Sequence, residues 1–287
     1  MRHPPPAITA GWPTPNSIDP DTHGRTLVIV NATTLLLALV SIGLRLYAHV
    51  TIVKTPGWDD FLMAIAAVNC CGVTACVVLA SELYGWNLHV WDLSPLQQMQ
   101  GRKVSIAAQT VFLFASSSSK LSILTHYLRI AVVGSHFRKA TLAMFIVVVA
   151  TMITFLSLLW AQCAPITGYW NLSSNSASCI PEGPPLLAQA IVTELIDLIV
   201  YVLPMPTLWV LKLPLTQRIS LMALFGLGAV VIVAACMRAY WVWYIEFATY
   251  DVTWCGSELW IWAAVEANLG VICGCAPAMK PLLQRYR

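Results

Sequence analysis

The sequence has few charged residues. Lys and Arg number 16 and Asp and Glu 13 among 287 residues, so 10% of the chain is charged while 58% is hydrophobic. Soluble domains are usually about 25% charged, and this composition therefore excludes an ordinary soluble protein. The net charge of +3 is not gathered into a basic stripe with interleaved aromatic residues, so nucleic acid is excluded as a partner.

The chain also lacks the patterns of metal sites and signal peptides. No CxxC motif or His pair accompanies the nine cysteines, so no metal site is expected. The first 25 residues are polar and contain several prolines, without the apolar stretch that a signal peptide needs. We expect residues 1–25 to form a flexible polar tail.

Long apolar runs are abundant instead. Each is long enough to cross about 30 Å of hydrocarbon, which takes about 20 helical residues. A backbone in lipid must satisfy its own hydrogen bonds, so the runs are expected to be helices. The predicted fold class is all-α, a seven-transmembrane-helix bundle at residues 26–280 followed by a short cytosolic tail at 281–287. The seven runs are Thr26–Ala48, Trp58–Ala80, Lys103–Thr125, Ala140–Ala161, Leu186–Leu211, Ile219–Trp241 and Leu259–Met279.

The distribution of positive charge predicts the orientation. One set of connections carries ten Lys and Arg residues, whereas the other carries four or five. By the positive-inside rule the first set faces the cytosol. The N-terminus is then outside and the C-terminus cytosolic. We expect a multi-pass protein of the endoplasmic reticulum or plasma membrane, in contact with the lipid bilayer.

Two cysteines flank one outer loop. Cys163 and Cys179 would face an oxidising compartment in this topology, where disulfides form and persist. We therefore expect a disulfide between them. Asn171 begins an Asn-Leu-Ser glycosylation sequon in the same loop.

Three carboxylates fall inside the apolar runs: Glu194, Asp197 and Glu266. A charge near the bilayer centre costs about 2.5–3.5 kcal/mol on insertion scales, and no Lys or Arg is evident at their depth. Helical rise places Asp197 about 15–16 Å and Glu266 about 12 Å from the outer helix ends. Two interpretations remain open: hydrogen bonds between helices, with one carboxyl protonated, or a reaction pocket with these three residues as catalytic groups.

Four residues are candidates for ligand binding. His89 lies in an outer loop between Trp86 and Trp91, either as part of a pocket lid or beside interfacial anchors. Gln109 reaches middle depth on the third run, and Arg238 near the outer end of the sixth is the cation within reach of Glu194. Trp262 belongs to an outer aromatic cluster, which is either a membrane belt or a cavity lining. The expected ligand is a lipophilic small molecule.

Asp59 and Asp60 begin the second run at its cytosolic end. Acidic residues at a helix start bind free backbone N–H groups, which is the structural interpretation. The alternative is an ion lock with Lys120 or Arg129. Lys120 lies roughly 24 Å from the outer end of its run, so its ammonium would extend to the cytosolic face to reach these carboxylates.

Several motifs together resemble one family. The chain is similar to the fungal rhodopsin-domain-like integral membrane proteins, which include putative receptors and members from secondary-metabolite clusters such as the satratoxin cluster. The resemblance covers nearly the whole chain and implies a seven-helix bundle of fungal origin. It is carried by GWDD at Gly57–Asp60, WDLSP at Trp91–Pro95, KLSILTHYLRI at Lys120–Ile130, QCAP at Gln162–Pro165 with its partner Cys179, and the segments Asp197–Pro214 and Glu258–Leu283.

The resemblance does not imply retinal. The last run has no internal Lys, because Lys280 lies at its cytosolic end, so neither a Schiff base nor another cofactor is expected. The chain also lacks the Cys-rich outer module and the long polar cytosolic tail of receptor-like members. Only seven residues follow Lys280, which weakens the expectation of signalling.

Three functions follow from these observations. The favoured one is a membrane protein of fungal secondary-metabolite biosynthesis, acting as an acid-initiated cyclase or isomerase with Asp197, Glu266 or Glu194 as the acid. The alternative is a receptor-like sensor of a small ligand. A transporter is weakest, because no inverted repeat or broken-helix pair is seen. A cytosolic protein or a biosynthetic enzyme is the expected protein partner.

Overall fold

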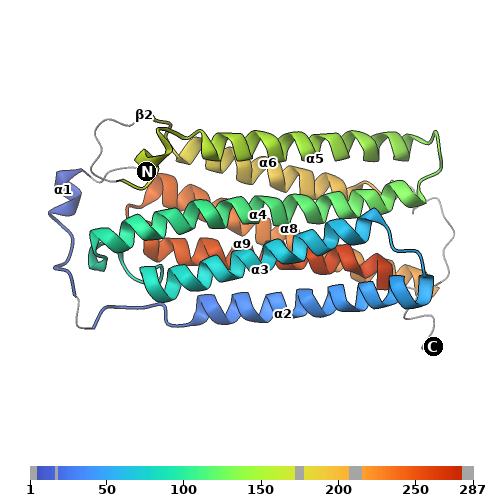
Figure 1. Cartoon of the computed structure of the whole chain (residues 1–287), viewed down its shortest axis with the longest axis horizontal. Coiled ribbons are helices and arrows are strands. Elements are labelled where there is room, and N and C mark those ends of the chain that lie inside the picture. The colour runs from blue at the N-terminus through green and yellow to red at the C-terminus, as the bar shows by residue number, and fades with distance from the viewer. Residues whose placement is uncertain (1–4, 17–18, 172–177, 207–214, 280–287) are drawn as a thin grey trace.

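The computed structural model describes residues 5–16, 19–171, 178–206 and 215–279. Within them, long helices run along a common axis and form one bundle (Figure 1). The predicted all-α class is therefore confirmed. The long helices are α2 (Thr26–Tyr47), α3 (Trp58–Tyr84), α4 (Pro95–Ile130), α5 (His136–Trp160), α6 (Gly183–Val202), α8 (Leu215–Trp243) and α9 (Val252–Cys275).

Short elements extend or join these helices. A π-helical turn continues α2 over η1 (Ala48–Val53), and another continues α8 over η4 (Tyr244–Ala248). The other short elements are α1 (Pro6–Thr9), η2 (Val90–Asp92), η3 (Ile166–Tyr169), η5 (Ala276–Met279), β1 (Cys163–Ala164) and β2 (Ser178–Cys179).

Side chains near helix starts explain several boundaries. The Ser94 hydroxyl accepts a hydrogen bond from the Gln97 N–H at 3.3 Å, while the Gln97 amide oxygen accepts from the Ser94 N–H at 3.0 Å. This reciprocal pair, followed by Pro95 in the first turn, starts α4. Helix α3 ends just before Gly85, which has a φ of +69°, a left-handed conformation that glycine adopts without strain.

Six helices are long and apolar enough to cross a membrane among the described residues: α2 with η1, α3, α5, α6, the α8 segment from Gly226 with η4, and α9. The long helix α4 is not one of these six. Its middle carries four consecutive serines and Lys120, which lower its hydropathy. The structure thus supports a multi-pass membrane protein.

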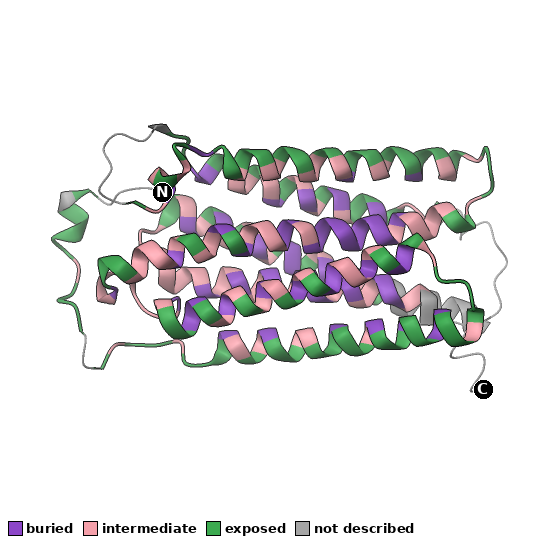
Figure 2. Ribbon diagram, in the orientation of Figure 1, coloured by how far each residue is buried: buried purple, intermediate pink, exposed green. Residues whose placement is uncertain are grey.

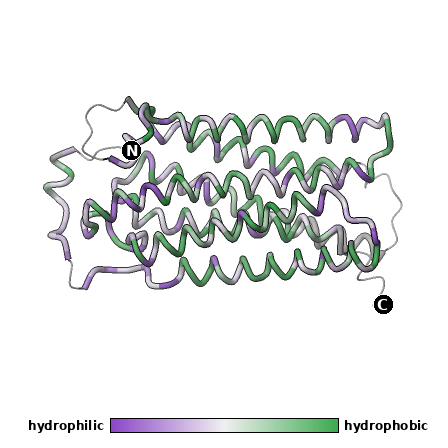
Figure 3. The backbone as a smooth tube through the Cα atoms, in the orientation of Figure 1, coloured by the Kyte–Doolittle hydropathy of each residue, from purple (hydrophilic) through white to green (hydrophobic). Residues whose placement is uncertain are grey.

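The helices differ in how much apolar surface they bury. Only 6% of the apolar window of α5 is buried, against 50% of that of α9. Figure 2 shows α5 as largely exposed, and Figure 3 shows the same helix as hydrophobic over most of its length. An exposed apolar helix fits contact with lipid, whereas α9 lies inside the bundle.

Two apolar clusters fill the bundle. The larger joins α2, α3, α4 and α9 and includes Val73, Val77 and Val271. The smaller joins α4, α5 and α6 around Leu124 and Val148. Because α4 contributes to both clusters, it lies at the centre of the packing.

The loop after α5 contains the predicted disulfide. Cys163 of β1 is paired with Cys179 of β2 in an antiparallel ladder and bonded to it through sulfur. The expectation of this disulfide is confirmed. Asn171 is exposed, but the rest of its sequon and the C-terminal segment with Lys280 lie outside the described residues.

Candidate functional site

A cavity of about 350 Å³ lies at the bundle end where α3 and α8 finish and α4, α6 and α9 begin. Its volume falls within the range of about 300–1,000 Å³ that is usual for ligand pockets. Trp12 of the N-terminal segment also lines it. Five helices and this segment therefore enclose one space.

Aromatic side chains form part of the cavity wall. Trp86 follows α3 and Trp260 belongs to α9, and their rings stack with centroids 5.3 Å apart and an interplanar angle of 21°. Both are buried. Gly101 lets the Trp86 ring lie close to α4, because a Cβ there would lie 3.1 Å from Trp86 Nε1. The paired rings contribute apolar surface to the cavity lining.

Arg238 of α8 lines the cavity and holds a buried ion pair. Its Nε donates to Glu266 Oε2 at 2.6 Å, and its Nη2 to Glu266 Oε1 at 3.2 Å. The same Nη2 donates to Thr193 Oγ1 at 3.1 Å, and the guanidinium lies 5.0 Å from the centre of the Phe112 ring. This bidentate geometry compensates a carboxylate removed from water.

A second buried ion pair joins α4 to α6. Lys120 Nζ lies 3.1 Å from Asp197 Oδ2 and donates to Ser116 Oγ at 2.6 Å. Asp197 is also within electrostatic reach of Glu266 and Arg238. Asp197 and Glu266 thus lie in one polar layer, each beside its own cation.

The third acid, Glu194, lies apart from this layer. Its Oε1 accepts a hydrogen bond from the Cys236 thiol of α8 at 2.6 Å. Among the described residues Arg238 pairs with Glu266 instead of Glu194.

Arg102, Tyr169 and Glu182 form another part of the cavity wall. The Arg102 guanidinium lies 5.1 Å from the centre of the Tyr169 ring, and its Nη2 is 3.8 Å from Glu182 Oε2. Burial, followed by the negative charge of Glu182, raises the pKa of Tyr169 well above its ordinary value. The phenol therefore stays protonated at neutral pH and donates a hydrogen bond to Glu182.

His89 lies in an aromatic stack outside the cavity lining. Its ring is nearly parallel to those of Trp91 and Trp254, with centroids 4.4 Å and 3.9 Å away. Its Nδ1 lies 2.5 Å from Asp251 Oδ2, and Asp251 Oδ1 accepts from the Val90 N–H at 3.0 Å. These contacts fix the loop after α3 to the start of α9.

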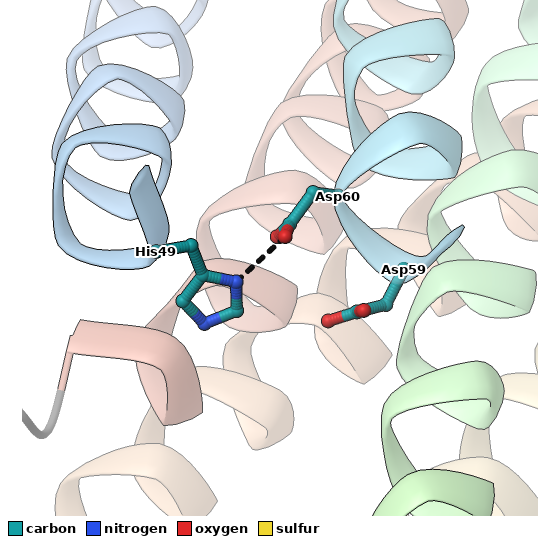
Figure 4. Close-up of side chains that lie close together, drawn as sticks. All are labelled: His49, Asp59 and Asp60. Carbon is teal, nitrogen blue, oxygen red and sulfur yellow. Dashed lines mark hydrogen bonds and ion pairs between the residues drawn. The ribbon is translucent and has the colours of Figure 1, made fainter. Parts of the chain in front are cut away.

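A cluster of charged residues occupies the opposite end of the bundle. Arg45 of α2 is 1% exposed and donates to Asp60 Oδ1 at 2.8 Å and to Asp59 Oδ2 at 2.6 Å. His49 Nδ1 lies 2.7 Å from Asp60 Oδ2, as Figure 4 shows. Arg129 Nη1 approaches Asp59 Oδ1 at 3.6 Å.

The cluster contains three groups of the kind that bind metals. Ligand atoms of His49, Asp59 and Asp60 lie within 4.8 Å of one another. Arg45 already donates to both carboxylates, so a cationic side chain offsets their negative charge. The cluster is better explained as an ion-pair network joining α2, α3 and α9, because Arg45 Nη1 also donates to the Gly274 carbonyl at 2.8 Å.

Sequence comparison identifies the family. The fungal rhodopsin domain matches residues 44–285, which is most of the chain. The protein belongs to the fungal rhodopsin domain family. The expected family is thereby confirmed, and residues from Arg45 to α9 all fall inside the matched range.

Curated relatives of this fungal rhodopsin-domain protein have two kinds of name. It is 27% identical over 86% of its length to "Receptor GIN3" of Arthrobotrys oligospora, and spans 59% of that protein. It is 26% identical over 86% of its length to "Wortmanamides biosynthesis cluster protein C" of Talaromyces wortmannii, spanning 67% of it. It is 23% identical over 84% of its length to "Fugralins biosynthesis cluster protein 2" of Gibberella zeae, and spans 61% of that protein.

The structure corrects two predictions about charge. Asp197 and Glu266 were expected to lack cations at their depth, but Lys120 and Arg238 contact them. The alternative interpretation of Asp59 and Asp60 was an ion lock with Lys120 or Arg129. Lys120 contacts Asp197 instead, whereas Arg129 approaches Asp59 and Arg45 binds both aspartates. Lys120 lies inside the bundle because Ser116 and Asp197 satisfy its ammonium there.

The candidate ligand residues divide into two groups. Gln109 and Arg238 line the cavity, whereas His89 and Trp262 are not part of its lining among the described residues. Their binding roles stay predictions. The sequence does not indicate Arg102, Trp86 and Trp260 as lining residues, although Trp86 lies in the same loop as His89. The position of Gly101, one residue before Arg102, is a weak signal of close packing there.

Proposed function

We propose that this protein crosses the membrane seven times, with α4 as the additional span and the N-terminal end outside. The length of α4 supports this, since its 36 residues exceed the roughly 20 needed to cross hydrocarbon. Its polar middle is directed into the bundle, where Ser116–Lys120 is buried. The excess of Lys and Arg in one set of connections supports the orientation.

We further propose that the outer-end cavity binds a lipophilic small molecule and that the protein acts as a receptor-like sensor of it. The observation that carries this proposal is the cavity itself, enclosed by five helices and lined by aromatic rings with a few polar groups. Helix α4 reaches both ends: Gln109 lines the cavity, and Ser122 Oγ donates to the Asp59 carbonyl at 2.6 Å in the charged cluster. One relative carries the name receptor.

An acid-initiated cyclase or isomerase of secondary-metabolite biosynthesis is the second candidate. The names of several relatives from biosynthesis clusters favour it. Geometry favours it less, because Asp197 and Glu266 have cationic partners and neither lines the cavity. A cation beside a carboxyl group favours its ionised form, which carries no proton to donate. Unchanged product from separate Asp197→Asn and Glu266→Gln variants would remove these two residues from the acid role.

The test is selection of compounds from an organic extract of a fungal culture by protein in lipid nanodiscs, read by native mass spectrometry. A Gly256→Leu variant fills the cavity, because Gly256 lines it and a Cβ there meets no atom within 4 Å. Gly43→Leu is the matched control, since Gly43 is an exposed helical glycine with equally open space. Compounds should bind wild type and Gly43→Leu but not Gly256→Leu.

Chromatography of the recovered compound distinguishes the two candidates. A sensor returns the compound unchanged, whereas a cyclase or isomerase returns a product of the same mass with a different retention time. Equal retention of every compound by wild type and Gly256→Leu would refute ligand binding in the cavity.

A further inference from the structure

Arg102 is a hydrogen-bond donor in the cavity wall whose requirements are not met. Its side chain is 11% exposed, and its Nε is buried without a hydrogen-bond partner among the described residues. Its Nη2 is 3.8 Å from Glu182 Oε2, which is beyond hydrogen-bond distance. A buried guanidinium N–H without a partner is costly, so an acceptor is missing from this wall.

A bound molecule can supply an acceptor to the terminal N–H groups of Arg102 from the cavity side. Arg102 lines the cavity, so a bound molecule can reach it. On its other side the guanidinium faces the Tyr169 ring, which offers no lone pair to the N–H groups. The phenol of Tyr169 is engaged with Glu182. An oxygen of the ligand is therefore the group that fits.

The charges around the cavity select a neutral acceptor. Among the described residues the charged lining consists of Arg102, Arg238, Glu182 and Glu246, and Glu266 pairs with Arg238 from behind. The wall therefore has no surplus positive charge, and a carboxylate on the ligand would add a further negative charge at short range. A carbonyl oxygen accepts from Arg102 without that repulsion.

A cationic ligand fits less well. An ammonium group has no lone pair and would leave Arg102 unsatisfied. Glu182 and Glu246 each already have an interaction within the protein, so neither is waiting for a cation.

The stacked indoles indicate the body of the ligand. Trp86 and Trp260 stack on each other and both line the cavity, so a flat conjugated or alicyclic skeleton can pack against the indole surface that the stack leaves open. Apolar contact with these rings supplies most of the binding, and the single polar contact at Arg102 orients the molecule.

We propose that the cavity binds a neutral lipophilic compound with a flat skeleton, whose carbonyl-type oxygen accepts a hydrogen bond from Arg102. Esters, lactones, ketones and amides belong to this class. The inference rests on the proposed ligand binding and adds the chemistry of the ligand.

The test uses four probes with one ring system and one substitution position: methyl naphthoate, naphthoate, naphthylmethylammonium and propylnaphthalene. Radiolabelled methyl naphthoate is titrated onto the full chain in nanodiscs, with empty nanodiscs as the blank for partitioning into lipid. The other three compete for the same site. Methyl naphthoate should bind most tightly.

Arg102→Met tests the donor, with Lys103→Met as its matched control because Lys103 is exposed and does not line the cavity. The Arg102 variant should bind methyl naphthoate about tenfold more weakly, as expected when a hydrogen bond from a charged group is lost. Its affinity for propylnaphthalene should change less than about twofold, because apolar contacts remain. Lys103→Met should match wild type for both probes.

Three results would overturn the inference. If propylnaphthalene binds as tightly as the ester, the ligand needs no hydrogen-bond acceptor. If naphthoate or the ammonium probe binds more tightly than the ester, the ligand is charged and not neutral. Absence of saturable ester binding would also refute it. If cavity-dependent binding of extract compounds persists in these cases, ligand binding in the cavity stands and only the ligand class is wrong.

Discussion

At the scale of single residues, the buried charges in the middle of the bundle are arranged in pairs. Lys120 with Asp197 and Arg238 with Glu266 each hold opposite charges in contact inside the bundle. Each buried charge loses its hydration, and its partner compensates for this loss only while both are present. The pair as a whole therefore adds little net stability, whereas removal of one partner alone strongly destabilises the protein.

Lys120→Met should destabilise the protein by about 3–5 kcal/mol, because it leaves Asp197 buried without its cation. Lys120→Met combined with Asp197→Leu should recover most of the loss, since both charges are then gone. The measurement is the free energy of unfolding in detergent micelles. Arg129→Met is the control, because the 42% exposed Arg129 side chain should contribute less than about 1 kcal/mol to its contact with Asp59. Additive losses in the double variant would contradict the pairing.

The sequence predicts how far along a helix axis each residue lies, but not which side of the helix faces the cavity. Trp262 and Trp260 lie two positions apart on α9, and about 100° of rotation per residue puts them on different faces. Only Trp260 lines the cavity, among the described residues. A helix that is apolar on all sides carries no signal that fixes its rotation, so the choice between the two required the structure.

At the scale of elements, α6 and α8 approach closely at a glycine. A Cβ on Gly228 would lie 1.9 Å from Tyr201 Cε2, so no larger residue fits while the ring stays in place. Small residues at a helix interface allow such approach in membrane proteins.

Gly228→Ala should destabilise the protein by about 1–3 kcal/mol, because the methyl group displaces the Tyr201 ring. Gly226→Ala, two positions earlier on the exposed side of α8, should instead stabilise by up to about 1 kcal/mol through helix propensity. Thermal unfolding of both variants in one detergent gives the comparison. Equal shifts in the same direction would show that the Tyr201 contact does not limit the helix separation.

The sequence predicts where the long helices occur, but it predicts their lengths less well. Apolar runs located all the long helices, but the run Lys103–Thr125 underestimates α4, which extends from Pro95 to Ile130. Polar residues continue the helix beyond the hydrophobic run because Ser94 and Gln97 cap its start. The sequence Ser-Pro-Leu-Gln contains that signal, whereas the pairing of α4 with α6 through Lys120 depends on tertiary packing.

At the scale of the whole molecule, the number of crossings decides where the two ends lie. Seven crossings place them on opposite sides, while six crossings, without α4, place them on the same side. In intact cells an epitope at the N-terminus should be removed by external protease, and one at the C-terminus only after permeabilisation. Loss of both epitopes in intact cells would exclude the seven-span arrangement.

Asn171 supplies an independent check of that orientation. If its loop is outside, glycosidase treatment should increase gel mobility of the wild type, and Asn171→Gln should abolish the shift. An Asn171→Gln protein with the mobility and glycosidase response of wild type would contradict the assignment of this sequon.

The Cys163–Cys179 bond has a practical consequence for producing the protein. Tyr169 lies between the two cysteines and Glu182 lies three residues beyond the second, so the bond ties both to the cavity rim. If this loop never enters an oxidising compartment of the host, the protein will lack the disulfide, and Tyr169 and Glu182 will not be held at the cavity by it. Eukaryotic secretory expression is therefore the appropriate source for binding work, and reductant should be kept out of the purification buffers.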